Sequence, residues 1–169
     1  FANKNLFINI HSHHHAQQDE WVIKSLYRNF EETAEPGHYS IGLHPWYIHS
    51  ENWMKDLSAL KKFSKTDSVL AIGECGLDKA CDTDFKLQQQ VFTTQVNWAN
   101  EIKKPLIIHC VRAYGEVLSI LQKNNNKVPV IFHGFNKNGV VASKILSDGH
   151  WLSFGKSLFR DKIVMAFAT

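Results

Sequence analysis

Four histidines and one glutamate stand at the ends of short apolar runs: His11, His13, Glu74, His109 and His133. The run before Glu74, Val-Leu-Ala-Ile-Gly, is typical of a buried strand. A buried carboxylate costs free energy unless a positive partner meets it. Imidazole nitrogens and carboxylate oxygens together suit a divalent cation. The pattern therefore predicts a metal-dependent hydrolase.

His11 and His13 lie two residues apart at the end of a strand-like segment. Alternate residues of a strand project from the same face, so both rings can reach one ion. The histidine cluster is interrupted and follows an apolar run, which disfavours an expression tag. Taken singly, His109 and His133 would also fit core histidines that hydrogen-bond to a neighbour. Their combination with Glu74 on separate strand ends favours a metal site.

Glu74 has two carboxylate oxygens and can therefore bridge two cations. Two divalent ions roughly 3.5–4 Å apart lower the pKa of a shared water and hold the reacting oxygens. Such a pair suits a phosphodiester, whose non-bridging oxygens gain charge during hydrolysis, and it also suits amides and esters. The residues therefore predict two divalent metal ions and a hydrolytic reaction, and leave the substrate open.

Strand-like and helix-like segments alternate along the chain. Strands are expected at 6–10, 20–27, 39–43, 69–74, 106–109, 128–132 and 151–155, and helices from a Ser50 cap to 63, at 84–103, at 113–123 and up to 147. Apolar runs without alternation indicate a parallel sheet covered by helices. The strand ends of a parallel barrel all open on one face. We therefore expect an α/β fold, a TIM-type (β/α) barrel, in a single domain over residues 1–169.

The composition is that of an ordinary globular protein and limits the classes of partner. Lys plus Arg number 19 and Asp plus Glu 16, a net charge of +3 that neither indicates nor opposes nucleic-acid binding. No apolar run approaches the roughly 20 residues of a membrane span, and no signal peptide is evident. The three cysteines at 75, 81 and 110 form no even disulfide set. We expect a cytoplasmic protein without membrane contact or an obligate protein partner.

Five motifs resemble, in order, the signatures of TatD-family metal-dependent deoxyribonucleases of the amidohydrolase-like superfamily. They are Ile-Asn-Ile-His-Ser-His at 8–13, Gly-Leu-His-Pro-Trp at 42–46, Ala-Ile-Gly-Glu-Cys-Gly-Leu-Asp at 71–78, Pro-Leu-Ile-Ile-His-Cys at 105–110 and Val-Ile-Phe-His-Gly-Phe at 130–135. The resemblance implies a TIM-like barrel, two divalent ions, and hydrolysis of DNA or a related phosphodiester. By the same resemblance, His11, His13 and catalytic Glu74 look like ligands of a first metal, and Glu74, His109 and His133 like ligands of a second.

The resemblance also implies residues that hold the substrate. His44 matches a histidine associated with the substrate phosphate, and a turn histidine is the alternative. The family's usual His-Ser-Arg-Asp becomes His-Cys-Val-Arg, so Arg112 can meet a phosphate with two hydrogen bonds or be an ordinary surface arginine. Asp78 is expected to order its surroundings rather than to bind metal, and Trp46 is the aromatic residue best placed to stack a base. The ligands would accept zinc, manganese or magnesium.

The chain departs from the family in three further places. Asn9 stands where the family usually has Asp, and the segment between His13 and Trp21 leaves little room for a first helix. No Glu-Thr-Asp motif follows Trp151. Because a barrel of this type usually needs about 200–250 residues, we expect the last β/α unit to be missing and the barrel edge to be open.

Two other functions stay open at this point. An amidohydrolase-like enzyme would cleave an ester or an amide, but such barrels often bridge their metals with a modified lysine, where this chain has Glu74. A non-catalytic relative that keeps the fold and binds metal or nucleic acid would fit the absence of the terminal Asp. Metal-dependent DNA cleavage that is lost in the Glu74→Ala variant would favour the nuclease.

Overall fold

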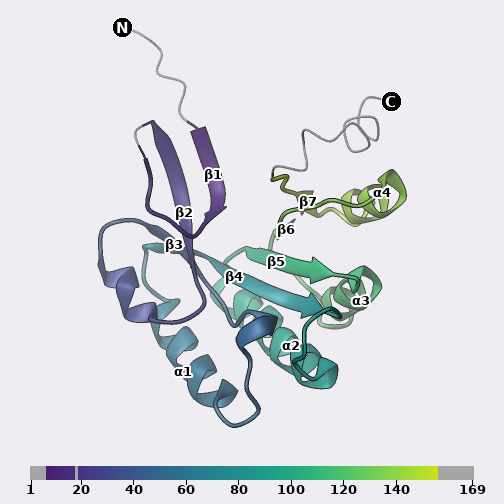
Figure 1. Ribbon diagram of the computed structural model, residues 1–169, viewed down its shortest axis with the longest axis horizontal. Coiled ribbons are helices and arrows are strands. Elements are labelled where there is room, and N and C mark those ends of the chain that lie inside the picture. Colours follow the sequence, from purple (N-terminus) through teal and green to yellow (C-terminus); the bar gives the residue numbers. More distant parts are fainter. Residues whose placement is uncertain (1–6, 18, 156–169) are drawn as a thin grey trace, which may run out of the picture.

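The computed structural model describes residues 7–17 and 19–155, and seven strands run through them (Figure 1). They form one parallel sheet in chain order: β1 Phe7–Ser12, β2 Glu20–Leu26, β3 His38–Ile41, β4 Val69–Asp78, β5 Leu106–Val111, β6 Val130–Phe132 and β7 Trp151–Leu152. Parallel pairing of strands in consecutive order is the topology of a (β/α) barrel. The expected TIM-type α/β fold is confirmed, as a curved, partly closed barrel in the described residues.

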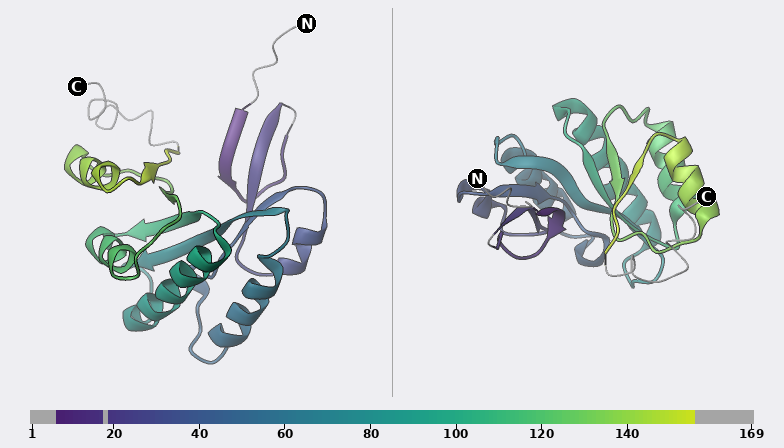
Figure 2. Two further views of the ribbon diagram at one scale, coloured as in Figure 1. Left: turned by 180° about the vertical axis from the view of Figure 1, so that it is seen from behind. Right: turned by 90° about the horizontal axis from the view of Figure 1, so that it is seen from above.

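Helices cover the convex face of this sheet, and the strands curve around the opposite, concave face (Figure 2). The helical elements are η1 Phe30–Ala34, η2 Pro45–Tyr47, α1 Trp53–Phe63, α2 Phe85–Ile102, α3 Tyr114–Lys123 and α4 Gly139–Ser147. In α2, the fully buried residues Phe92, Val96 and Ala99 recur every three to four positions, as a helix against a sheet requires, and Val91 lies buried beside Phe92. The main core therefore lies between the sheet and its helices and leaves the concave face free for polar residues.

Local signals explain where the long helices begin and end. The carboxylate of Asp84 accepts a hydrogen bond from Leu87 N at 2.8 Å and caps α2. The expected Ser50 cap of α1 is wrong. Residues 50–52 form a turn, because the backbone N–H groups of Asn52 and Trp53 both bond to the His49 carbonyl at 3.1 Å. The helix therefore begins at Trp53, with Asn52 in the N-cap position.

Strand β4 is longer than expected and carries Glu74 in its middle rather than at its tip. It pairs with β5 as far as Asp78, which lies opposite Val111. The register shifts between Gly73 and Cys75, so Glu74 has no partner residue on β5. A bulge of this kind breaks the regular alternation and redirects a side chain. The expected strand ended at residue 74 because a charged residue followed an apolar run, whereas β4 continues past Glu74 to Asp78.

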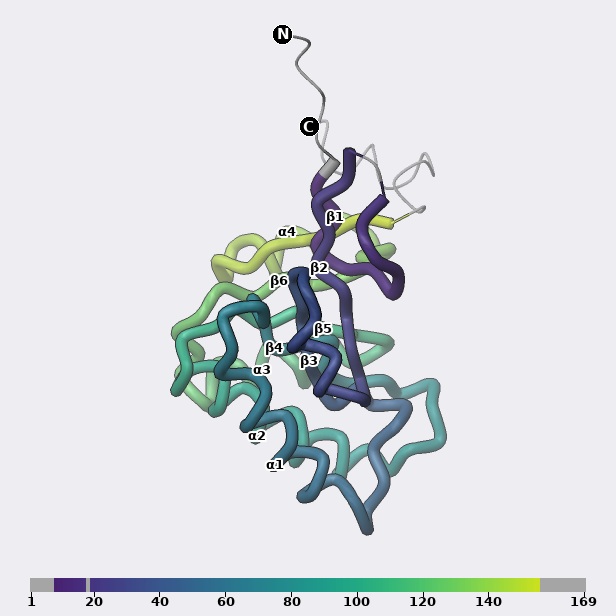
Figure 3. The backbone as a smooth tube through the Cα atoms, turned by 90° about the vertical axis from the view of Figure 1, so that its left-hand side faces the viewer, coloured from purple at the N-terminus to yellow at the C-terminus, as the bar shows by residue number. Residues whose placement is uncertain are grey.

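Strand β1 leads into β2 without an intervening helix among the described residues, as the short connection predicted (Figure 3). Within the part of the chain that the structure describes, β1 and β7 each pair on one side only. Large apolar side chains stand exposed on both, Ile8 at 68% and Trp151 at 65%. The expected open edge is therefore present in this part. The sequence from Asp161 to Thr169 could also begin a helix, but this segment lies outside the described residues. No described helix is long and apolar enough to cross a membrane.

Candidate metal centre

The concave face of the sheet holds a cavity of about 700 Å³. Its lining includes every metal-ligand candidate together with the expected phosphate-binding histidine: His11, His13, His44, Glu74, His109 and His133. They come from β1, β4 and β5 and from the segments that follow β1, β3 and β6. Because parallel strands direct their carboxyl ends to one face, residues distant in sequence meet there. Their roles as metal ligands stay a prediction.

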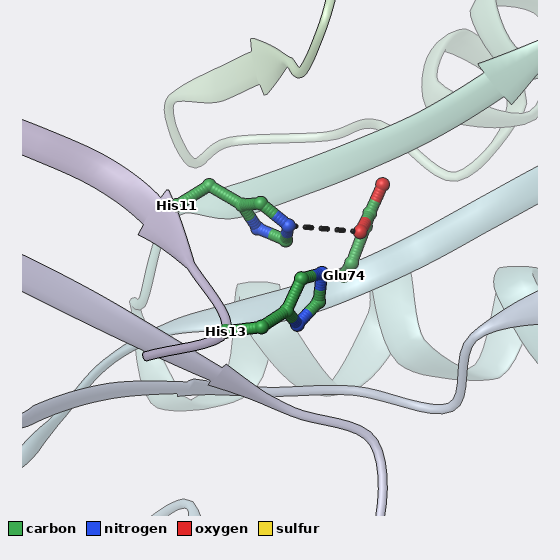
Figure 4. Close-up of side chains that lie close together, drawn as sticks. All are labelled: His11, His13 and Glu74. Carbon is green, nitrogen blue, oxygen red and sulfur yellow. Dashed lines mark ion pairs between the residues drawn. The ribbon is translucent and has the colours of Figure 1, made fainter. Parts of the chain in front are cut away.

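His11, His13 and Glu74 form the first cluster. Their potential ligand atoms lie within 4.8 Å of one another, and both imidazoles extend toward the carboxylate (Figure 4). Nε2 of His11 is 3.1 Å from Oε2 of Glu74. The His11 side chain is 5% exposed, and its Nδ1 has no hydrogen-bond partner among the described residues. A buried imidazole nitrogen without a partner is costly. A cation would bind the lone pair of this nitrogen, and a hydrogen-bond acceptor would bind its proton.

His44, Glu74 and His109 form the second cluster, whose ligand atoms also lie within 4.8 Å of one another. Nδ1 of His109 is 3.1 Å from Oε1 of Glu74, and Nε2 of His44 is 3.9 Å from Oε2. Glu74 thus belongs to both clusters, and its two oxygens face different histidines. His133 stands beside the first cluster, with its ring centroid 3.9 Å from that of His11.

This grouping differs from the one implied by the family resemblance, which put His133 with the second metal and kept His44 for the substrate. The hydrogen bonds of His44 bear on the choice. Its Nδ1 accepts a hydrogen bond from Trp46 N at 3.2 Å, so in the neutral ring Nε2 carries the proton and donates. A donor cannot ligate a cation through the same atom. The bond therefore favours His44 as a substrate contact and leaves His133 for the metal.

Burial keeps two of the histidines neutral. Desolvation lowers the pKa of His44 to about 4 and the pKa of His133 to about 4. Burial also disfavours the charged form of His109, but its hydrogen bonds to two carboxylates outweigh this and raise its pKa. For Glu74, burial is likewise outweighed by hydrogen bonds from His109 and His11, which hold its pKa below the usual value. The carboxylate of Glu74 is therefore ionised, and the neutral form is favoured for the His44 and His133 rings, which is the form of an imidazole that binds a metal.

Asp78 supports the second cluster from behind. Its Oδ2 lies 2.9 Å from His109 Nε2 and accepts a hydrogen bond from Trp46 Nε1 at 2.6 Å, while its Oδ1 accepts one from Ala80 N at 2.7 Å. A carboxylate behind a metal-binding histidine fixes the tautomer and turns the other ring nitrogen toward the metal. Here that nitrogen is Nδ1, the one facing Glu74. Asp78 therefore orders its surroundings, as the sequence indicated.

The chemistry of these residues fits divalent cations. The donors are imidazole nitrogens and carboxylate oxygens, the set that zinc and similar ions accept. Glu74 directs one oxygen toward His11 and the other toward His109, and one buried imidazole nitrogen has no hydrogen-bond partner among the described residues.

Asn9 and Arg112 occupy the margin of the site. Arg112 is exposed, has a φ of 54°, and is not among the described residues that line the cavity. Its contact with a phosphate stays a prediction. Asn9 lines the cavity, where its Oδ1 accepts a hydrogen bond from His11 N at 3.2 Å and its Nδ2 donates one to Glu20 Oε1 at 3.1 Å. A carboxylate at position 9 could not make the second bond, so the amide links β1 to β2.

Sequence reasoning missed three residues that line the same cavity: Tyr27, Tyr47 and Lys137. Tyr27 lies at the end of the expected strand 20–27, and none of the five motifs includes Tyr47 or Lys137. The useful signal was the position of Tyr47, which follows directly on the His-Pro-Trp motif at a strand end.

Gly76 lets β4 and β5 approach closely behind the site. Its φ is +144°, and a Cβ there would lie 2.0 Å from the carbonyl oxygen of His109. Gly76→Ala is therefore expected to push the two strands apart and to lower the free energy of unfolding by roughly 3 kcal/mol, measured by urea denaturation. Gly115→Ala in α3 is the matched control, because its Cβ would meet nothing within 4 Å. Equal stability of the Gly76 variant and the wild type would contradict the clash.

Sequence comparisons relate the chain to proteins of one family. The family model described as "TatD related DNase" matches residues 5–166. An uncharacterized metal-dependent hydrolase of Buchnera aphidicola (subsp. Baizongia pistaciae) is 35% identical, over 68% of this chain and 43% of its own length. A protein of Yersinia pseudotuberculosis named 3'-5' ssDNA/RNA exonuclease TatD is 34% identical, over 57% of this chain and 38% of its own length. The chain spans about half the length, or less, of these curated relatives.

Two solved structures share the fold. YjjV, a TatD homologue from Escherichia coli K12, superposes with a TM-score of 0.74 at 21% identity, over 88% of this chain and 68% of its own. A TatD-family hydrolase from Entamoeba histolytica gives a TM-score of 0.75 at 17% identity, over 89% of this chain and 65% of its own. The family match covers nearly the whole chain, and the strand order agrees with it. The chain belongs to the TatD-related DNase family.

Proposed function

We propose that the protein is a metal-dependent hydrolase that cleaves phosphodiester bonds of DNA with an activated water molecule. The observation that carries the proposal is the position of Glu74, whose two carboxylate oxygens face His11 and His109 on the concave face. Two divalent ions, of zinc, manganese or magnesium, would lower the pKa of the water and offset charge on the phosphate oxygens.

The chain's own side chains have separate tasks in this proposal. His11 and His13 hold one ion with Glu74, and His109 and His133 hold the other with the same carboxylate. Burial lowers the pKa of His133 and favours the neutral ring that binds a metal, which supports the role of this residue. Asp78 accepts a hydrogen bond from Nε2 of His109, so that Nδ1 of the neutral ring can bind the metal, as is usual for a carboxylate behind a metal-bound histidine.

Three groups would hold the scissile phosphate. His44 presents an Nε2–H donor into the cavity, fixed by the bond that its Nδ1 accepts from Trp46 N. Lys137 adds an exposed positive charge at the cavity wall. Arg112 follows the last residue of β5 and is exposed, next to Val111 of the cavity wall. All three complement the anionic phosphate that a nuclease must orient.

The names of the relatives support a nucleic-acid substrate, since one of them is called an ssDNA/RNA exonuclease. Hydrolysis of an ester or amide, and metal or nucleic-acid binding without catalysis, are the alternatives that a test must separate. The three unpaired cysteines suit the reducing cytoplasm that we propose for this protein.

The test combines metal analysis with assays on three kinds of substrate. We expect two bound divalent ions per chain by elemental analysis, and cleavage of a DNA oligonucleotide that EDTA abolishes and added metal restores. A p-nitrophenyl ester and an anilide serve as the ester and amide substrates. Cleavage of these compounds without cleavage of any phosphodiester would overturn the nuclease function. Metal binding without hydrolysis of any substrate would indicate the non-catalytic alternative.

A further inference from the structure

A line of stacked and tilted rings leads away from the metal centre. The ring centroids of His109 and His44 are 4.4 Å apart, those of His44 and Tyr47 are 5.7 Å apart, and those of Tyr47 and Tyr27 are 4.2 Å apart. The two tyrosine planes differ by 18° and are therefore stacked. Beyond them, the guanidinium carbon of Arg28 lies 5.1 Å from the Tyr27 ring centroid. Each step is a recognised aromatic or cation–π contact.

The tyrosine pair is not part of the protein's core. Tyr47 is 45% exposed and its neighbour Trp46 is 53% exposed. Neither Tyr27 nor Tyr47 belongs to the core cluster formed by the described residues. Exposed aromatic surface beside a functional cavity is typical of a binding site for a flat, apolar ligand group.

A second cavity, of about 480 Å³, continues the metal cavity along these rings. The two cavities share four lining residues and therefore form one groove: His13, Ser25, Tyr27 and Tyr47. Arg28 and Asn29 line the outer part of this groove. We name this outer part, which is lined by Tyr27, Tyr47, Arg28 and Asn29, the tyrosine groove.

The charges of the groove suit a polyanion. Glu32 is the acidic residue that lines its outer part, and it is neutralised by an ion pair with Lys24. Arg28 is exposed and has no carboxylate partner among the described residues. Lys137 lines the metal cavity itself. A chain of phosphates could therefore meet a cation at the metal centre and another at the outer end of the groove.

We propose that the tyrosine groove is a subsite for the nucleotide next to the scissile phosphate of a single strand. This inference rests on the nuclease function proposed above and adds the residues that select its substrate. An unpaired base stacks on the Tyr47–Tyr27 pair, and the phosphate beyond it pairs with Arg28. Stacking accepts any base, because every base has a flat π face. A duplex keeps its bases stacked on each other, so the subsite selects against it.

Binding is measured by fluorescence anisotropy with a labelled oligothymidylate in EDTA, where no cleavage occurs. Tyr47→Leu removes the ring and keeps an apolar side chain, and it is expected to weaken binding about 5- to 100-fold. Tyr47→Phe is the matched control, because it keeps the ring, and is expected to bind within twofold of wild type. An oligonucleotide with an abasic nucleotide at each position in turn tests the base itself. At one position it should bind the wild type as weakly as Tyr47→Leu binds the normal strand.

Arg28→Gln gives a second, independent readout. It should reduce the slope of log affinity against log salt by about one, whereas Tyr47→Leu should leave the slope unchanged. Equal binding by Tyr47→Leu and wild type, or equal binding of the normal strand and of every abasic strand, would overturn the subsite. Hydrolysis of methyl p-nitrophenyl phosphate, which has no base, reports separately on the proposed function. If the wild type does not hydrolyse this compound but its DNA binding depends on the Tyr47 ring, only the nuclease function is refuted. If the wild type hydrolyses it but its DNA binding does not depend on the ring, only the subsite is refuted.

Discussion

Replacing Glu74 with glutamine is expected to remove binding of both divalent ions and to lower phosphodiester hydrolysis by at least about 1,000-fold. Glutamine keeps the size of the side chain but loses the negative charge, and its nitrogen is a donor rather than a ligand. Both clusters use this carboxylate, through different oxygens that face His11 and His109. A single substitution should therefore disrupt two sites. Isothermal titration with zinc or manganese gives the metal stoichiometry, and an oligonucleotide assay gives the rate.

Glu116→Gln is the matched control for this experiment. Glu116 pairs with Lys79 on the surface, away from the residues that line the cavity. Its neutralisation is expected to leave the metal stoichiometry and the hydrolysis rate unchanged. If the Glu74→Gln protein still bound one ion with wild-type affinity, Glu74 would serve one cluster only. The bridging role would then be refuted.

The fold was predictable because its signals are local. Neighbouring residues determine the apolar runs, the helical spacing and the cap at Asp84. Strands and helices that alternate regularly along a chain are compatible with few topologies. The convergence of histidines from several strands follows from the parallel barrel itself. Sequence reasoning could therefore gather His11, Glu74, His109 and His133 without coordinates.

What the sequence could not supply depends on register and on contacts between distant segments. The bulge at Glu74 arises from the pairing of β4 with β5. The sequence of either strand alone does not determine this register. The position of His44 beside Glu74 depends on a loop, and its tautomer depends on a backbone N–H two residues on. The stacking of Tyr27 on Tyr47 joins the residue after β2 to the 3-10 helix η2. No local pattern encodes such a meeting.

The metal-free protein is expected to lose stability as the pH falls from about 6.5 to 4. A histidine in an unfolded chain has a pKa of about 6.5, whereas burial lowers the pKa of His44 to about 4 and that of His133 to about 4. Between these values the unfolded state binds protons that the folded state does not. The free energy of unfolding therefore rises with pH in this window, by up to about 3 kcal/mol for each histidine.

Other titrating groups of the site do not cancel this effect. The folded pKa of His109 is raised. Its stabilising contribution is complete below about pH 6.5 and is lost only as the pH rises through the folded value. The pKa of Glu74 is lowered, so its contribution is present above the usual carboxyl pKa of about 4.3 and is lost below it. Neither group opposes the change between pH 4.5 and 6.5.

Urea denaturation in EDTA at pH 4.5, 5.5 and 6.5 measures the effect directly. His133→Asn keeps a polar group at the site without a titrating ring, and should reduce the pH dependence by about half. His49→Asn, which removes an exposed histidine, should keep the wild-type profile. A stability that does not change over this range would mean that the imidazoles of the cavity are hydrated and charged in the folded state. Charged imidazoles must release a proton before they bind a cation, whereas neutral imidazoles already have a free lone pair. The pH profile therefore also tests whether the metal-free site has the protonation state that metal binding requires.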